Sequence, residues 1–162
     1  MARNRKPLRM QYKHYLCKLM SFRDGFPLNH YPTTIEFSVA QLVSIQPSEV
    51  AAYMRLCAYG TATPGPNDRP THCRSSTLEV VKKAISFFVP NKSPWIIQAD
   101  GVSGVGNPSR STDVNQVIKQ VELAEVRKQG RASNAKRDMK AAGRIPENTP
   151  SPGSKVCSDQ SF

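Results

Sequence analysis

Long hydrophobic runs, closely paired cysteines and a secretory leader are all missing from this sequence. No stretch approaches the roughly 20 consecutive apolar residues that a membrane-spanning helix needs, so we expect no membrane partner. The four cysteines stand at wide, irregular spacings with no C-x2-C pair. A disulfide framework or a zinc site would need closer spacing. We therefore expect reduced, mostly buried thiols in an intracellular protein.

Convergent reactive groups are also missing. His14, His30 and His72 are isolated, and none stands at metal-binding spacing from a Cys, Asp or Glu, so ordinary surface or half-buried roles are expected. The stretch GVSGVGNP has the glycines of a phosphate loop, but no lysine follows it and no predicted strand precedes it. The sequence therefore predicts no metal, no cofactor and no active site.

Acidic side chains are scarce at both ends of the chain, whose net charge is +11. Residues 1–23 carry seven basic and no acidic side chains, and residues 127–144 carry seven basic ones against Asp138 alone. Residues 24–126 carry eight basic and nine acidic groups, which nearly cancel. Two cationic flanks on a neutral body favour a polyanionic partner, because Lys and Arg release counterions from phosphates. Basic ends that are merely solvated are the alternative.

Apolar residues recur at helical spacing and not in strand-like alternation, which predicts an all-α domain of about five helices. The expected segments are 12–22, 35–43, 47–59, 76–88 and 113–130. The loop at 60–73 and the long loop after Pro90 separate them, with Trp95 expected to pack back on the helices. The implied organisation is a basic arm at 1–11, a helical domain at 12–130, and a basic, then Pro/Ser-rich, disordered tail at 131–162.

Start and stop signals refine these helices. Thr33 or Thr34 is a candidate cap for the second helix, and Pro47 suits the first turn of the third, which Gly60 stops. For the other two helices, the sequence favours a capping box between Ser76 and Glu79, a cap at Ser111 or Thr112, and an end at Gly130.

Basic side chains on helix surfaces are the remaining functional candidates. Lys82 and Lys83 stand about 100° apart on a helix, away from its apolar stripe, and should present an edge of two charges. Arg74 and Arg110 precede two helix N-termini, where free N–H groups favour phosphate. The candidate DNA contacts are Arg74, Lys82, Lys83, Arg110, Lys119, Arg127, Lys128 and Arg131.

Two stretches of the sequence, taken in this order, are similar to a known protein family. RPTHCRSSTLEVVKKAISFFVPNKSPW, followed by GNPSRSTDVNQVIKQVELAEVRKQG, resembles the N-terminal core-binding region of tyrosine recombinases from Crypton-type mobile elements. The likeness runs from about residue 43 to residue 130. It departs from the family at Cys73, where glycine is usual, and in the longer loop IIQADGVSGV.

The resemblance implies a SAM-like helical bundle that clamps duplex DNA through phosphate contacts. Such contacts position a protein on DNA without reading the base sequence. The family's cleavage needs a tyrosine in a further domain, and the last tyrosine here is Tyr59. We therefore expect no catalysis by this chain, with self-association on DNA or a partner chain that carries the catalytic domain. Nuclear localisation follows, with a mitochondrial leader as its alternative. The alternative function is a helical protein-interaction module with solvated basic ends.

Overall fold

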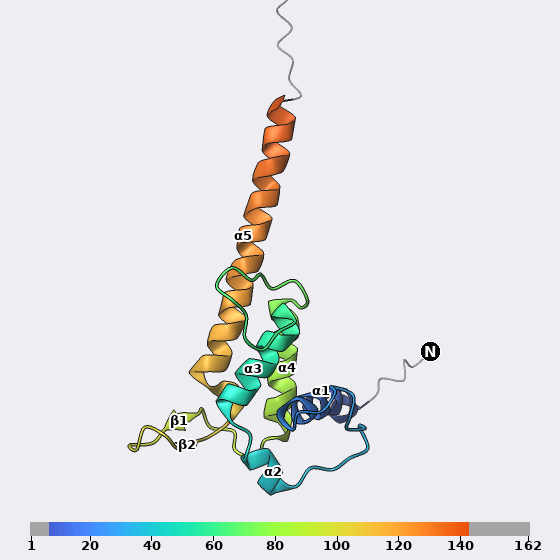
Figure 1. Cartoon of the computed structure of the whole chain (residues 1–162), viewed down its shortest axis with the longest axis vertical. Helices are drawn as coiled ribbons and strands as arrows, with labels where there is room; N and C mark the ends of the chain where they lie inside the picture. Colours follow the sequence, from blue (N-terminus) through green and yellow to red (C-terminus); the bar gives the residue numbers. More distant parts are fainter. Residues whose placement is uncertain (1–6, 143–162) are drawn as a thin grey trace, which may run out of the picture. The chain divides into compact units, whose positions relative to one another are not determined.

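The computed structural model describes residues 7–142, which form five α-helices, one short 3-10 helix and one small sheet. The α-helices are α1 (Leu8–Arg23), α2 (Val39–Val43), α3 (Pro47–Tyr59), α4 (Ser75–Phe88) and α5 (Thr112–Ala142) (Figure 1). Between α4 and α5 lie β1 (Ile96–Ile97), β2 (Gly104–Val105) and the 3-10 helix η1 (Pro108–Arg110). The mostly helical fold confirms the prediction of a small all-α bundle.

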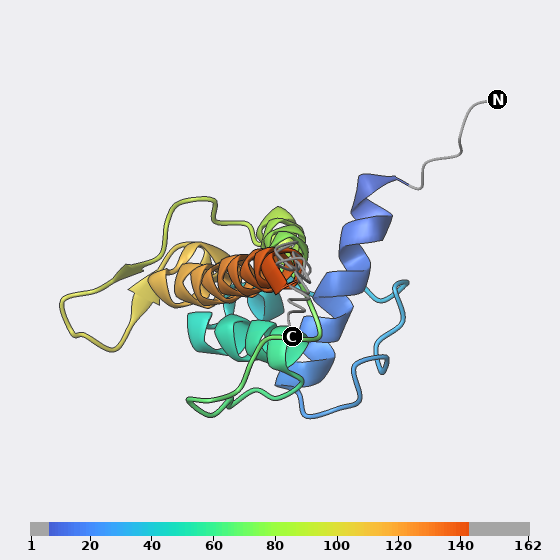
Figure 2. The same cartoon turned by 90° about the horizontal axis from the view of Figure 1, so that it is seen from above.

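The chain divides into two compact units, residues 1–128 and 129–162, so α5 contributes residues to both. The first unit holds the hydrophobic core. There α1 packs on α3 and α4, which also pack on each other, and η1 contacts both α3 and α4 (Figures 1 and 2). Fully or nearly fully buried side chains come from four helices: Leu16, Leu19, Met20, Val50, Tyr53, Met54, Leu78, Val81, Ile85, Val114, Val117 and Val121. These are the apolar stripes that the helical spacing predicts.

The second predicted helix is shorter than expected. It begins at Val39, not near Ile35, and Ser38 is its cap where Thr33 or Thr34 was expected. The Ser38 hydroxyl accepts a hydrogen bond from the Gln41 N–H at 3.3 Å, and the Gln41 side chain accepts one from the Ser38 N–H at 2.8 Å. This capping box satisfies the otherwise free N–H groups of Ser38 and Gln41, and it therefore places the start of the helix at Val39.

Two other helix starts match their predictions. Pro47 opens α3, and Gly60 ends it in the left-handed conformation at φ 78°. Ser111 caps α5, since its hydroxyl accepts a hydrogen bond from the Val114 N–H at 3.3 Å.

The helix α1 begins at Leu8, four residues before the predicted start, so part of the expected N-terminal arm is helical. Residues 1–6 lie outside the described residues.

The prediction that the last helix ends at Gly130 is wrong, because α5 continues to Ala142. Glycine inside a helix costs only about 1 kcal/mol relative to alanine. The following residues RASNAKRDMKAA include good helix formers such as Ala, Arg, Lys and Met, which offset that cost. The expected tail therefore begins no earlier than residue 143, and the stretch from there to 162 lies outside the described residues.

The long loop after α4 contains a small hairpin that the sequence did not predict. In it β1 and β2 pair antiparallel, with Ile96 opposite Val105 and Ile97 opposite Gly104. Trp95 was expected to pack on the helices, but it is not among the half-buried side chains against the core; its indole lies against Gly104, where an added Cβ would be 2.3 Å from Cζ2. Glycine is therefore required at position 104 to leave room for the indole ring.

We expect Gly104→Ala to displace Trp95 and to shift its fluorescence emission to longer wavelength, because the new methyl group overlaps the indole. Carbon atoms in contact normally stay about 3.5–4.0 Å apart. Trp95 is the only tryptophan, so its emission spectrum reports this site alone. Gly65→Ala is the control, since its Cβ would meet Asp68 at an ordinary 3.6 Å. Identical spectra for the wild type and both variants would contradict the Trp95–Gly104 packing.

Candidate nucleic-acid interface

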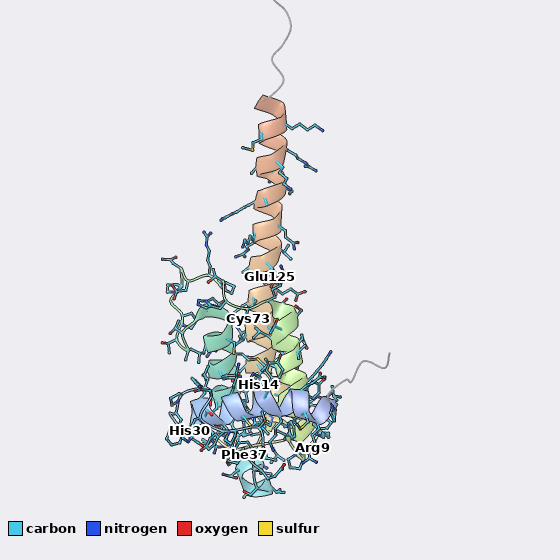
Figure 3. The ribbon with its side chains drawn as sticks, turned by 90° about the vertical axis from the view of Figure 1, so that its right-hand side faces the viewer. Arg9, His14, His30, Phe37, Cys73 and Glu125 are labelled. Atoms are coloured by element: carbon cyan, nitrogen blue, oxygen red, sulfur yellow. The ribbon has the colours of Figure 1, made fainter. Side chains whose placement is uncertain are left out.

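The N-terminus of α4 is already occupied by a carboxylate. The Glu125 side chain, from α5, accepts hydrogen bonds from the Ser75 N–H at 3.0 Å and from the Ser75 hydroxyl at 2.7 Å. Figure 3 shows Glu125 close to Cys73, just before α4. The predicted capping box between Ser76 and Glu79 is therefore wrong, since the cap comes from another helix. One of the N–H groups that were expected to favour a phosphate beside Arg74, that of Ser75, instead donates to this carboxylate.

Lys82 and Lys83 do not form the expected edge of two charges. The Lys82 ammonium donates a hydrogen bond to Asn115 Oδ1 at 2.7 Å, which ties Lys82 to the first turns of α5. Lys83 is exposed and shares a face of α4 with Val80 and Phe87, three residues before it and four residues after it. The 100° between successive helical residues directs the two lysines to different neighbours.

Arg110 is also partly committed to the fold. Its guanidinium donates a hydrogen bond to the backbone carbonyl of Lys92. The Lys92 ammonium in turn donates to the last carbonyls of α4, including Phe87 at 3.0 Å and Val89 at 2.7 Å. A lysine on these carbonyls stabilises the negative end of the helix dipole. Both cations thus help to attach the hairpin segment to α4, and Arg110 remains exposed.

Three of the four described cations of the N-terminal flank are paired within the fold. Arg9 and Lys13 both approach Glu36, at 3.5 and 3.4 Å, and Arg23 approaches Asp24 at 3.1 Å. Lys13 is only 4% exposed, and its ammonium lies over the rings of Phe37 and Phe88 at 5.5 and 5.6 Å. These cations and their partners stabilise the fold, so they are poor candidates for binding a polyanion.

The cations of α5 are different. Lys119, Arg127 and Lys128 in the first unit are exposed, and so are the four described basic residues of the second unit, Arg131, Lys136, Arg137 and Lys140. Within residues 7–142 none of these seven has a hydrogen bond or an ion pair. The sequence candidates did not include Lys136, Arg137 and Lys140. The charge run made them visible, but the helix was expected to end before them.

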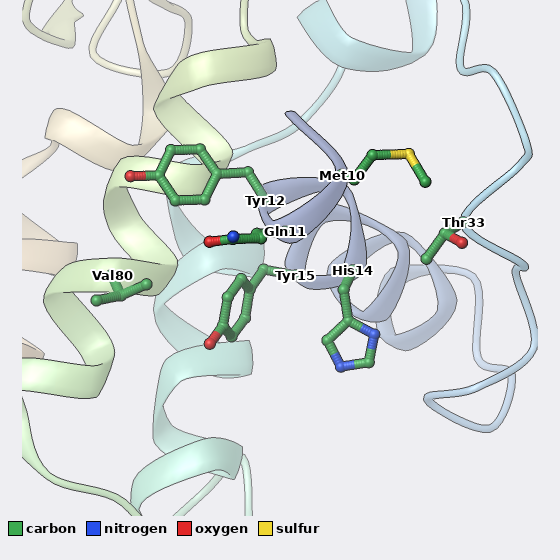
Figure 4. Close-up of a pocket in the computed structure, with 7 residues that line it drawn as sticks. All are labelled: Met10, Gln11, Tyr12, His14, Tyr15, Thr33 and Val80. Atoms are coloured by element: carbon green, nitrogen blue, oxygen red, sulfur yellow. The ribbon is translucent and has the colours of Figure 1, made fainter. Parts of the chain in front are cut away.

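A groove lies between α1 and α4, with a volume of about 420 Å³. Met10, Gln11, Tyr12, His14 and Tyr15 of α1 line it, together with Thr33 and, from α4, Val80 (Figure 4). None of these side chains is acidic. Burial and, to a smaller extent, the charge of Lys18 lower the pKa of His14, so this imidazole is neutral at pH 7. The groove is therefore an uncharged hollow with two tyrosines, a feature that helical periodicity alone did not indicate.

Three of the cysteines fall within the described residues, and all three are free thiols. Cys17 is buried, while Cys57 and Cys73 are half-buried beside the core. Burial raises the pKa of each thiol, so each stays protonated at neutral pH and is a weak nucleophile. Cys157 lies outside the described residues.

Residues 7–142 hold neither a metal-binding cluster nor a membrane-spanning helix. No three side chains among His, Cys, Asp and Glu come together as a metal site would require. In the same part of the chain, every helix is too short or too polar to cross a membrane.

Comparisons of this chain with protein-family models, with curated proteins and with solved structures gave no match. The likeness to the core-binding region of Crypton-type recombinases therefore remains a prediction.

Glu125→Ala should lower the free energy of unfolding by about 1–2 kcal/mol, because it leaves the Ser75 N–H and hydroxyl without their acceptor. Chemical denaturation followed by circular dichroism measures this loss. Glu122→Ala, on an exposed position of the same helix, is the matched control and should change stability by less than about 0.5 kcal/mol. A comparable loss in Glu79→Ala with none in Glu125→Ala would instead favour the local capping box.

Proposed function

We propose that this chain binds double-stranded DNA through phosphate contacts and does not itself cleave the strand. The observation that carries the proposal is the set of exposed basic side chains on α5 that have no acidic partner within the described residues. Arg9, Lys13 and Arg23 of α1 serve as an internal contrast, because each of these cations has an acidic partner within the fold. A basic helix with free charges lowers its free energy by neutralising phosphates and releasing their counterions.

The contacts are proposed for α5 first, at Lys119, Arg127, Lys128 and Arg131, and then for Lys136, Arg137 and Lys140. Arg74, Lys83 and Arg110 are exposed and can add contacts, whereas Lys82 contributes less because Asn115 holds its ammonium. Flexible Lys and Arg side chains that bind phosphate read little sequence. The expected binding is therefore strongly salt-dependent and weakly selective among DNA sequences.

Catalysis is not part of the proposal. In these 162 residues the last tyrosine is Tyr59, so we propose that a nucleophile for strand cleavage of the recombinase type lies outside them, for example on a partner chain. We propose that the protein acts as a DNA clamp in the nucleus, either alone, through self-association on DNA or together with such a partner chain. The resemblance supports the nuclear location and the role as a DNA clamp, and the free cations of α5 support the binding of phosphates.

A second candidate function is a protein-interaction module, favoured by the hairpin. The hairpin extends away from the helices of the first unit (Figures 1 and 2). Ile96 and Ile97 are each 65% exposed and Val102 is 92% exposed, so large apolar side chains of this segment face solvent. Exposed apolar clusters commonly mark contacts with other proteins. A protein-interaction module does not require the α5 cations to bind anything. Replacing those cations therefore distinguishes it from the DNA-binding function.

Replacing Arg127, Lys128 and Arg131 together by alanine should weaken duplex binding and make it less sensitive to salt. Each lost phosphate contact reduces the slope of log affinity against log salt by about 0.9, so the triple variant should lose roughly two to three units. Fluorescence anisotropy of a labelled blunt duplex across a salt series measures both quantities.

Arg9→Ala is the matched control, because it removes an exposed cation that is paired with Glu36. Its slope should stay close to that of the wild type. Equal slopes for the wild type and the triple variant would contradict the assignment to α5. An absence of duplex binding even at low salt would contradict the function itself and favour the interaction module.

A further inference from the structure

We infer that the groove between α1 and α4 binds an unpaired nucleobase, so that the preferred substrate is duplex DNA with a single-stranded extension. This inference rests on the proposed function and deepens it by naming the part of the nucleic acid that the groove accepts.

The walls combine aromatic and apolar side chains. Tyr12 and Tyr15 are half-buried and point from α1 toward α4, with Val80 opposite them (Figure 4). The edge of the Tyr12 ring meets Phe87 with the ring centroids 5.7 Å apart, which supports the orientation of Tyr12. Tyrosine rings are the common stacking partners of bases in single-stranded nucleic acids, and every base offers a π face to them.

The volume of the groove suits a small planar ligand. About 420 Å³ lies in the lower part of the range of small-molecule sites, which also combine apolar walls with a few polar groups. Such groups are present here in the Tyr12 and Tyr15 hydroxyls, the His14 imidazole and the Thr33 hydroxyl. They can bond to the edge of a base while its face stacks on a ring.

Cations stand at the rim, and no carboxylate lines the groove. Lys83 lies one helical turn from Val80, and Lys18 lies one turn from His14, whose pKa its charge helps to lower. Neither lysine has an ion pair within residues 7–142. An uncharged aromatic hollow with lysines at its edge matches a nucleotide, which places a neutral base beside a negative phosphate.

Two occupants other than a base fit less well. An apolar side chain from a peptide would fill the hollow but would need no cations at the rim. A free anion would use the lysines but not the tyrosines. A nucleotide uses both features of the groove at once.

The test compares three labelled DNA ligands on the full chain by anisotropy: a blunt duplex, the duplex with an extension of about six thymidines, and the duplex with an equal extension of abasic sites. The two extensions carry the same phosphates, so charge alone gives them equal affinity. Base stacking should make the thymidine extension bind about tenfold more tightly than the abasic one.

Two variants locate the effect in the groove. Tyr12→Leu removes a ring but keeps an apolar side chain, and Val80→Glu places a carboxylate in the groove at a position 38% exposed in the wild type. Both should reduce the affinity ratio between the extensions to near one. Ile97→Glu changes the net charge as Val80→Glu does, on the exposed hairpin, and should keep the ratio.

The possible results separate the two claims. Equal affinity of the wild type for both extensions, with salt-dependent binding of the blunt duplex, overturns the base site and leaves the proposed function intact. A tenfold ratio that survives in Tyr12→Leu and in Val80→Glu also overturns the placement in this groove. A failure of every ligand to bind at low salt overturns the proposed function together with the inference.

Discussion

The hydrogen bonds of Glu125 to Ser75 determine much of what the rest of this structure can do. They fix the start of α4 against α5, and the Lys82–Asn115 bond joins the same helices further along. Ser75 precedes Lys82 on α4 while Glu125 follows Asn115 on α5, so the two helices run in opposite directions. This pairing places a carboxylate where a phosphate was expected and commits Lys82 to the fold. Lys83 is thereby left on the other face, beside the groove.

The described cations of the two basic flanks differ in whether the fold pairs them. In α1, Arg9 and Lys13 approach Glu36, Arg23 approaches Asp24, and the buried Lys13 ammonium lies over aromatic rings, so three of the four cations of this helix have partners within the fold. On α5 the exposed cations have no such partners among the described residues. Net charge alone cannot separate these cases, because a paired and a free lysine contribute equally to it. We therefore propose that a polyanion binds to α5, the helix whose charges the fold does not use.

Sequence reasoning succeeded where local signals decide the structure. Helical spacing located the core faces of α1, α3, α4 and α5, and Pro47 and Gly60 bound α3 as predicted. It failed where a distant residue decides, since no local pattern indicates that Glu125 caps a helix 50 residues earlier. It also overvalued Gly130 as a stop, because a single glycine costs little inside a long run of helix formers. The groove depends on two helices packing together, which periodicity cannot supply.

The most direct test of the central claim is an NMR titration of the ¹⁵N-labelled chain with an unlabelled blunt duplex at low salt. The account predicts that backbone amide shifts concentrate along α5, from Lys119 through Arg127 to Lys140. The amides around the Arg9–Glu36 pair should remain almost unchanged. Shifts confined to α1 or to the hairpin, with α5 unaffected, would contradict the account, because the DNA would then bind where the fold already uses its charges or exposes none.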